Sequence, residues 1–467
     1  MQKYLIKNIQ IVNEGRIYFS DVLINNERIE KIEPNISTNY KVIEIEGEKK
    51  YLFPGVIDDQ VHFREPGLTH KASIYTESKA AIAGGVTSFM EMPNTSPPTF
   101  TQDLLEDKYN IAAQTSLANF SFYMGTSNNN INEVLLTNEK KNEVCGIKIF
   151  MGSSTGNLLV DNFLTLDKIF AETELLIATH CEDEEIIKQN LLRIKEKKNV
   201  LEPSDHPIVR NEEACFESSF KAVQFAKKHN SRLHILHIST AKELQLFSNM
   251  LQLKDKKITA EVCVHHLHFT ANDYAAFGNL IKCNPAIKEP LHREALWQGL
   301  LDDRLDVIAT DHAPHLLAEK LPNNKAFREN WPLRDGKGSP PQAEGLEGAA
   351  GIPLVQHSLL LMLSYYKQGK IPLEKIVQKM SHAVSDCFKI KDRGYIREGY
   401  FADLVIIDLK QSTLVAKENI LHKCGWSPFE GQTFPAAITH AFINGNLILE
   451  NSMWNESIKG KRLLFNR

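Results

Sequence analysis

The spacing of hydrophobic positions changes twice along the chain. Apolar and polar residues alternate in "YLIKNIQIVN" and "YKVIEIEGEK" within residues 1–53, and a period of two is typical of short strands. The pattern returns in "GYFADLVIIDL" and "AAITHAFINGNLILENS", where Asn444-Gly445 predicts a hairpin turn. Because neither end has enough apolar residues for its own core, we expect one small β-sandwich domain built from both termini.

The middle of the chain alternates short apolar segments with amphipathic stretches. One of these stretches, "SIYTESKAAIAGG", predicts a helix that stops at Gly84-Gly85. Eight such units predict an α/β fold, a (β/α)8 TIM barrel with insertions. The expected strands are residues 55–63, 86–93, 119–125, 146–152, 175–182, 232–239, 258–266 and 305–315.

The domain organisation follows from these patterns. We expect an N-terminal part of the β-domain at residues 1–53, the barrel at 54–385, and the C-terminal part of the β-domain with a terminal extension at 386–467. A doubly wound sheet is the alternative. It would need a glycine-rich phosphate-binding turn after an early strand, and the sequence has none.

Composition and charge exclude several classes of protein. The 467 residues are 42% hydrophobic and 24% charged, with a net charge of −4, which indicates neither nucleic acid nor an anionic membrane as partner. No signal peptide or membrane span is expected from the sequence. Seven cysteines without a C-x-x-C pair favour neither a disulfide framework nor a cysteine zinc site. We therefore expect a cytoplasmic protein.

Reactive side chains gather at the ends of the expected strands. In a TIM barrel the carboxyl ends of all strands open on one face, which holds the active site. A single histidine there is more often a turn residue than a ligand, and His234 is interpreted in that way. The joint pattern predicts one site that unites His62, Arg64, Asn94, Lys148, His180, His237, His265, His266, Asp311 and His315.

Lys148 is unusual because its segment, "GIKIFMG", is apolar on both sides. A buried ammonium is costly, so the pKa of such a lysine falls toward the neutral amine. A neutral amine can take up CO2 to form a carbamate, which is an anionic ligand able to bridge two divalent ions. The alternative is a lysine that reaches the barrel mouth or pairs with Asp311.

Several motifs, in order, carry a resemblance that covers nearly the whole chain. "PGVIDDQVHFREPG", "EMPNT", "GIKIFMG", "THCE", "LHIST", "IATDHAPH" and "DRGYIREGYFADLVIIDL" resemble the motifs of dihydroorotases, in the hydantoinase-like branch of the amidohydrolase superfamily. The resemblance implies reversible, metal-dependent cyclisation of N-carbamoyl-L-aspartate to L-dihydroorotate in de novo pyrimidine biosynthesis. The alternatives are a hydantoinase or allantoinase, or a non-catalytic partner of aspartate transcarbamoylase.

The resemblance also implies roles for individual residues. One or two Zn²⁺ ions would be held by His62, Asp311, His180 and His237, and bridged by Lys148 as its carbamate. Asp311 would in addition transfer the proton during catalysis. The substrate carboxylate would be bound by Arg64, Asn94 and His315. Asn284 and the loop near Gly351 would contact the pyrimidine ring.

Gln60 departs from the family pattern, D-x-H-x-H, which has a histidine at this position. An amide oxygen is a weaker ligand for zinc than imidazole. Gln60 could ligate through its oxygen, could leave the first metal weakly held, or could leave a single zinc to act alone. Because the other ligand residues remain, we expect an active enzyme.

Some features stay open at this level. We expect a homodimer, with association with aspartate transcarbamoylase as a further option. The loop Phe150–Asn157 either closes over the substrate or is an ordinary turn, and residues 316–347 form either a lid or a surface loop. The sequence leaves undecided which of His265 and His266 matters.

Overall fold

Eight parallel strands form the centre of the molecule. The computed structural model describes residues 2–152, 158–322 and 346–467. Adjacent strands pair in chain order, and a bridge between Val61 and His312 joins the first strand to the segment after the last. This nearly closed ring confirms the TIM barrel. Its strands are β6 (Val56–Val61), β7 (Val86–Glu91), β8 (Asn119–Gly125), β9 (Gly146–Phe150), β10 (Ile177–His180), β11 (Leu233–Ile235), β12 (Ile258–Cys263) and β13 (Val307–Ala309).

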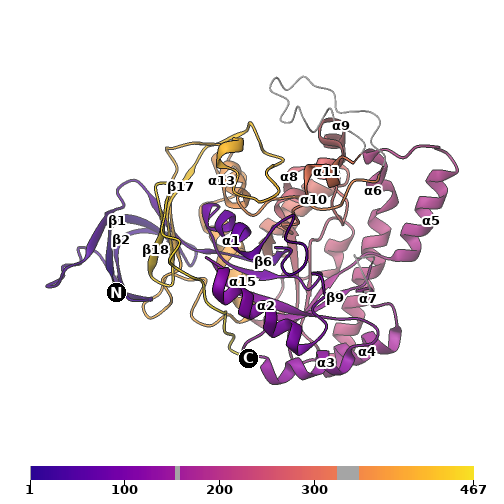
Figure 1. Cartoon of the computed structure of the whole chain (residues 1–467), viewed down its shortest axis with the longest axis horizontal. Coiled ribbons are helices and arrows are strands. Elements are labelled where there is room, and N and C mark those ends of the chain that lie inside the picture. The colour runs from indigo at the N-terminus through magenta and orange to yellow at the C-terminus, as the bar shows by residue number, and fades with distance from the viewer. Residues whose placement is uncertain (1, 153–157, 323–345) are drawn as a thin grey trace.

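Helices follow the strands and surround the barrel (Figure 1). The first begins where the sequence predicts, because the Ser73 hydroxyl accepts a hydrogen bond from the Thr76 amide, and it ends at Gly84. The larger helices are α1 (Ile74–Ala83), α2 (Gln102–Thr115), α3 (Ile131–Leu136), α4 (Phe163–Glu172), α5 (Glu184–Lys195), α7 (Glu212–His229), α10 (Pro290–Leu301), α13 (Ser358–Lys367) and α15 (Ala383–Phe388). Shorter ones include α6 (His206–Val209), α8 (Val264–His268), α9 (Tyr274–Phe277), α11 (Leu317–Lys320) and α14 (Leu373–Val377).

A separate sheet beside the barrel is built from both ends of the chain (Figure 1). Its nine strands run in the order β19-β18-β17-β14-β5-β1-β2-β3, with β4 paired to β1. The N-terminal β5 pairs with the C-terminal β14, which confirms that one domain unites the termini. The strands are β1 (Lys3–Asn13), β2 (Arg16–Asn25), β3 (Arg28–Glu33), β4 (Ile43–Glu46), β5 (Tyr51–Pro54), β14 (Leu404–Asp408), β17 (Ala437–Ile443), β18 (Asn446–Glu450) and β19 (Met453–Trp454).

The predicted hairpin turn joins β17 to β18. Asn444 and Gly445 both adopt the left-handed conformation, with φ values of 48° and 73°, as a two-residue hairpin turn requires. A Cβ atom on Gly445 would lie 1.9 Å from the carbonyl oxygen of Asn26. This position therefore needs glycine both for its φ angle and for the close approach of the neighbouring turn.

Several strands end earlier than expected. The seventh stops at Cys263, and His265 and His266 lie in α8 instead of in the strand. The sixth and eighth strands have only three residues each, because the backbone turns away from the ladder before His237 and Asp311, whose φ values are 38° and 47°. The segments expected from the sequence extend past these turns, so the sequence overestimated the length of the strands.

Other expectations are only partly covered by the described residues. The segment 316–347, expected to be a lid or a surface loop, begins with α11. Its residues 323–345, and residues 153–157 of the loop expected to close over the substrate, lie outside the described part. The domain boundaries at residues 53 and 385 stay predictions. No helix in the described ranges is both long and apolar enough to cross a lipid bilayer.

Candidate active site

A cavity of about 380 Å³ opens at the carboxyl ends of the barrel strands. It gathers residues that lie up to 291 positions apart in the chain, from Gln60 to Gly351, because each strand ends on the same face of the ring. Ten of the residues singled out from the sequence line it: Gln60, His62, Arg64, Asn94, Lys148, His180, His237, Asn284, Asp311 and His315. Gly351 lines it as well.

One side of the cavity holds His62 and Asp311. His62 Nδ1 lies 2.7 Å from Asn94 Oδ1, and Nε2 lies 3.0 Å from Asp311 Oδ1. Burial is the main cause that lowers the pKa of His62, so the ring is neutral at neutral pH. If Nδ1 donates its proton to Asn94, the lone pair of Nε2 faces the Asp311 carboxylate. Two facing acceptors favour a cation between them.

The opposite side holds His180 and His237. His180 Nδ1 lies 2.9 Å from His237 Nε2, and His180 Nε2 lies 3.1 Å from a carboxylate oxygen of Glu182. Burial lowers the pKa of both rings, which keeps them in the neutral form that binds metals. A carboxylate behind a histidine fixes its tautomer and leaves the other nitrogen free as a ligand. The structure thus presents two imidazole nitrogens that converge on one point.

Glu182 is in turn paired with Arg210, which also lines the cavity. Burial opposes the charge on Glu182, but Arg210 and His180 outweigh it and lower the pKa of Glu182 to about 2. The carboxylate is therefore ionised at neutral pH. Sequence reasoning missed Arg210, because it follows the short helix α6, far from any barrel strand, and no spacing rule links it to His180.

Lys148 lies on β9, which pairs with the strand that carries His180, and it lines the cavity. Its side chain is buried, its Nζ donates to the Ile149 carbonyl oxygen at 3.1 Å, and the ammonium lies 3.9 Å from the Phe150 ring centroid. Burial lowers the pKa of Lys148 to about 7. A large fraction of the side chain is thus the neutral amine near pH 7, which is the form that reacts with CO2.

Arg64 is a buried cation on the cavity wall, 7% exposed. Its Nε donates to the Pro314 carbonyl oxygen at 3.3 Å, and one terminal nitrogen lies 3.1 Å from His315 Nε2. Burial lowers its pKa to about 10, so it stays charged at neutral pH. Within the described residues it has no carboxylate ion-pair partner. An uncompensated buried charge is costly, and an anionic ligand would compensate it.

His315 stands beside Arg64, and three polar groups meet its two ring nitrogens. Lys71 Nζ lies 3.1 Å from Nδ1, and the Arg64 terminal nitrogen and the Ala350 carbonyl oxygen each lie 3.1 Å from Nε2. Burial and then the charge of Arg64 hold the pKa of His315 far below its usual range. The ring is a neutral hydrogen-bonding group in this pocket.

Three residues of the site have strained backbones. Arg64, His237 and Asp311 have φ values of 69°, 38° and 47°, in the left-handed region that non-glycine residues rarely occupy. Each follows the end of a barrel strand. Such strain clusters at functional sites, where the surrounding structure holds it in place.

Three histidines singled out from the sequence do not line the cavity. His234 is buried in a cluster with Asp59 and Glu261, and its Nε2 lies 3.2 Å from Asp59 Oδ2. His266 Nε2 contacts the Pro285 carbonyl oxygen at 3.1 Å, and His265 packs against it with ring centroids 4.2 Å apart. His234 lies in β11 and not in a turn, and it does not line the cavity.

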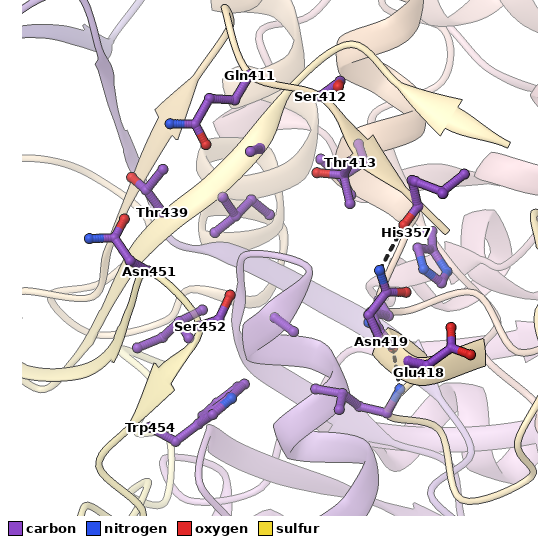
Figure 2. A pocket seen from close by; sticks show the side chains of 18 residues that line it. His357, Gln411, Ser412, Thr413, Glu418, Asn419, Thr439, Asn451, Ser452 and Trp454 are labelled. Atoms are coloured by element: carbon purple, nitrogen blue, oxygen red, sulfur yellow. Dashed lines mark hydrogen bonds between the residues drawn. The ribbon is translucent and has the colours of Figure 1, made fainter. Parts of the chain in front are cut away.

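A larger cavity of about 660 Å³ lies away from these residues, between α13 and the C-terminal strands (Figure 2). Polar side chains line it, but several are already paired within the protein. Gln356 donates to the Asn419 carbonyl oxygen at 2.7 Å, and Thr439 donates to the Ile406 carbonyl oxygen at 3.2 Å. This cavity lacks the converging imidazole and carboxylate groups of the smaller one.

Comparisons with known proteins show the family to which the chain belongs. The amidohydrolase family model matches residues 51–448. A dihydroorotase from Carboxydothermus hydrogenoformans is 33% identical over 434 residues, covering 92% of this chain and 94% of the relative. An allantoinase from Desulfitobacterium hafniense is 28% identical over 469 residues, covering 98% of each.

Solved structures show the same fold. L-hydantoinase (dihydropyrimidinase) from Arthrobacter aurescens has a TM-score of 0.87 at 24% identity, covering 97% of this chain and 98% of its own. The family model extends over most of the chain and includes every strand of the barrel. The chain therefore belongs to the amidohydrolase family and is a cyclic amide hydrolase.

Proposed function

We propose that the protein is a dihydroorotase, which interconverts N-carbamoyl-L-aspartate and L-dihydroorotate in de novo pyrimidine biosynthesis. Arg64 is the observation that favours a dihydroorotase over other cyclic amidases. It is a buried guanidinium at the cavity without an ion-pair partner among the described residues. Dihydroorotate has a ring carboxylate that would pair with it. Hydantoin and allantoin lack that carboxylate and would leave the charge of Arg64 uncompensated.

The donors around the cavity fit one or two Zn²⁺ ions. They comprise three neutral imidazoles, a carboxylate and a lysine with a lowered pKa, from His62, His180, His237, Asp311 and Lys148. We propose that His62 and Asp311 would hold one ion and that His180 and His237 would hold the other, with the Lys148 carbamate as a further anionic ligand. Zinc supplies a water of lowered pKa and polarises the amide carbonyl.

The chain's own residues would bind the substrate and move the proton. Arg64, His315 and the Asn94 amide nitrogen hold the ring carboxylate, because the Asn94 oxygen is already directed to His62. Asn284 and the loop at Gly351 contact the ring. In hydrolysis, Asp311 would take a proton from the water as its oxygen bonds to the ring amide carbon, and would pass that proton to the ring nitrogen as the C–N bond breaks. Cyclisation reverses these transfers.

Two other functions would give different experimental results. A hydantoinase or allantoinase would prefer uncharged rings, and this alternative is tested because one of the relatives is an allantoinase. A non-catalytic partner of aspartate transcarbamoylase would bind no metal and turn over nothing. The five donor side chains that remain, His62, Lys148, His180, His237 and Asp311, favour an enzyme over that scaffold. The proposal includes a homodimer in the cytoplasm, where the seven free cysteines of the chain would stay reduced.

Metal analysis of the purified protein, run beside hydrolysis assays with dihydroorotate, hydantoin and allantoin, tests the proposal. We expect bound zinc and turnover of dihydroorotate, with loss of activity after chelation and recovery on adding zinc back. Preference for the uncharged rings would point to a hydantoinase or allantoinase. A metal-free protein that stays inactive with added zinc would support the scaffold alternative.

A further inference from the structure

Lys320 is the last residue of α11 and is fully buried. Its ammonium donates to the carbonyl oxygens of Lys282, Ala349 and Gly351 at 2.9, 2.8 and 2.9 Å. These three bonds use every N–H that a lysine ammonium has. No carboxylate among the described residues pairs with it, so backbone carbonyls alone satisfy this buried charge.

A second buried lysine supports the same strip of backbone. Lys282 donates from its ammonium to the carbonyl oxygen of Gly348 at 2.7 Å and also to that of Leu346. The Gly351 amide donates back to the Lys282 carbonyl oxygen at 2.9 Å. Residues 346–351 are therefore held by two ammonium groups and by a backbone bond to the segment that contains Lys282.

This strip is one wall of the candidate active site. Ala349, Ala350 and Gly351 all line the cavity, and the Ala350 carbonyl oxygen lies 3.1 Å from His315 Nε2. A Cβ atom on Gly351 would lie 2.5 Å from the Ala313 carbonyl oxygen. The wall thus packs directly on the segment that would bind the substrate carboxylate.

Through the Lys282 carbonyl oxygen, the Lys320 ammonium is also connected to a second part of the cavity wall. Asn284, which lines the cavity, lies two residues after Lys282. Because the Lys320 ammonium bonds both the Lys282 carbonyl and the carbonyls of Ala349 and Gly351, it fixes the distance between these two parts of the wall. Lys282 and Lys320 lie behind this wall, because neither is among the residues that line the cavity.

We propose that Lys320 is a positioning residue that sets the width of the ring-binding part of the active site. It does not touch the substrate, and it acts through the backbone of residues 349–351 and through the segment carrying Asn284. The inference rests on the proposed dihydroorotase function, because it assigns these walls to the ring. Loss of the ammonium would leave three buried carbonyls without their donor and would let the two walls separate.

The test is the Lys320→Met variant, which keeps the length and burial of the side chain but removes its donors. We expect KM for dihydroorotate to rise on the order of tenfold or more, with kcat changed by less than about threefold. Zinc content should equal that of the wild type, since no proposed metal ligand is touched. A purely structural role would lower the melting temperature without moving KM.

Lys379→Met is the matched control. Lys379 is also buried, and its Nζ donates to the Leu305 carbonyl oxygen at 2.6 Å and lies 2.8 Å from Asp303 Oδ1. None of these residues lines the cavity. We expect this variant to lose thermal stability but to keep the wild-type KM.

Lys282→Met provides the same test if Lys320→Met does not fold, and we expect it to raise KM as well. An active wild type whose folded Lys320→Met or Lys282→Met variant keeps its KM would contradict the positioning role alone. A rise in KM of equal size in Lys379→Met would contradict it too. A zinc-loaded wild type that does not turn over dihydroorotate would instead contradict the proposed function.

Discussion

Gln60 donates its side-chain amide to Asp311, with Nε2 3.2 Å from Oδ1. The same carboxylate oxygen lies 3.0 Å from His62 Nε2. The carbonyl oxygen of Gln60 points the other way, 3.8 Å from the sulfur of Cys263. In this arrangement the amide nitrogen, which cannot bind a metal, faces the proposed metal site. Gln60 is thus placed to orient Asp311, and this favours a weakened first metal position.

The first prediction concerns the number of metal ions. We expect the wild type to hold one zinc tightly and a second only partly, because His180, His237 and the Lys148 carbamate remain as strong ligands. Gln60→His should raise the tightly bound count toward two, since imidazole binds zinc better than an amide. Metal analysis after dialysis measures both counts.

The Gln60→Met variant tests whether Gln60 orients Asp311 or binds the metal itself. If the amide only orients Asp311, this variant should keep the wild-type zinc content and lose activity. Loss of one firmly bound ion would instead identify Gln60 as a ligand. A wild type that holds two ions as firmly as Gln60→His would lead to the same conclusion.

The second prediction concerns Lys148. Replacement by Ala should abolish metal binding and activity, because the bridging carbamate cannot form. Short carboxylic acids added to Lys148→Ala should restore part of both, since a carboxylate can occupy the place of the carbamate. Lys108→Ala is the control, because Lys108 is equally buried but pairs with Glu91 at 3.0 Å, away from the cavity. Normal zinc content and rate in Lys148→Ala would rule out the carbamate.

The third prediction concerns Arg64. Arg64→Met removes the charge that would pair with the substrate carboxylate, at a cost on the order of 2–5 kcal/mol. Turnover of dihydroorotate should therefore fall by orders of magnitude, whereas any turnover of uncharged dihydropyrimidines should be spared. Steady-state kinetics with both substrates measures the difference. Equal losses on both would mean that Arg64 has a structural role.

The fourth prediction concerns the carboxylate behind His180. Glu182→Gln removes the negative charge that orients this imidazole, and such changes typically weaken metal binding by about 10–100-fold. Competition with a chelator measures the affinity for zinc. Glu243→Gln is the control, because Glu243 is buried but bonded to Ser219 and Thr240 outside the cavity. Equal zinc affinity in wild type and Glu182→Gln would exclude this role.

The fifth prediction concerns the stability of the fold at alkaline pH. Burial opposes a charge on His234, but Asp59 and Glu261 outweigh it and raise the pKa of His234 to about 9, from a usual 6.5. Between these pH values the folded protein keeps a proton that the unfolded chain has lost. The contribution of the charged His234 to the free energy of unfolding is thus complete below pH 6.5 and is lost as the pH rises through 9.

Denaturant unfolding at several pH values tests this dependence. The decline in unfolding free energy above pH 6.5 should be smaller in His234→Asn than in the wild type. His440→Asn is the control, because burial lowers the pKa of His440 to about 4, so this ring is neutral in both states at alkaline pH. An unchanged slope in His234→Asn would show that His234 is not charged in the folded protein.

Much of the architecture could be predicted from the sequence because it depends on local patterns. Alternation marked the strands of the terminal sheet, and short apolar segments marked those of the barrel. Asn444-Gly445 marked the turn between β17 and β18 through its own backbone preference. The convergence of His62, His180 and Asp311 followed from a single rule, that parallel strands of a barrel end on one face. These features needed no knowledge of which side chains touch.

Contacts between distant segments were decided only by the tertiary structure. The pairing of Arg210 with Glu182, the Lys320 ammonium among three carbonyls, and the direction of the Gln60 amide join parts of the chain that no periodicity relates. Such contacts depend on how whole elements pack, and on which buried polar atoms then require partners. The sequence by itself therefore determined the barrel, the terminal sheet and the residues at the strand ends, whereas packing decided what orients those residues.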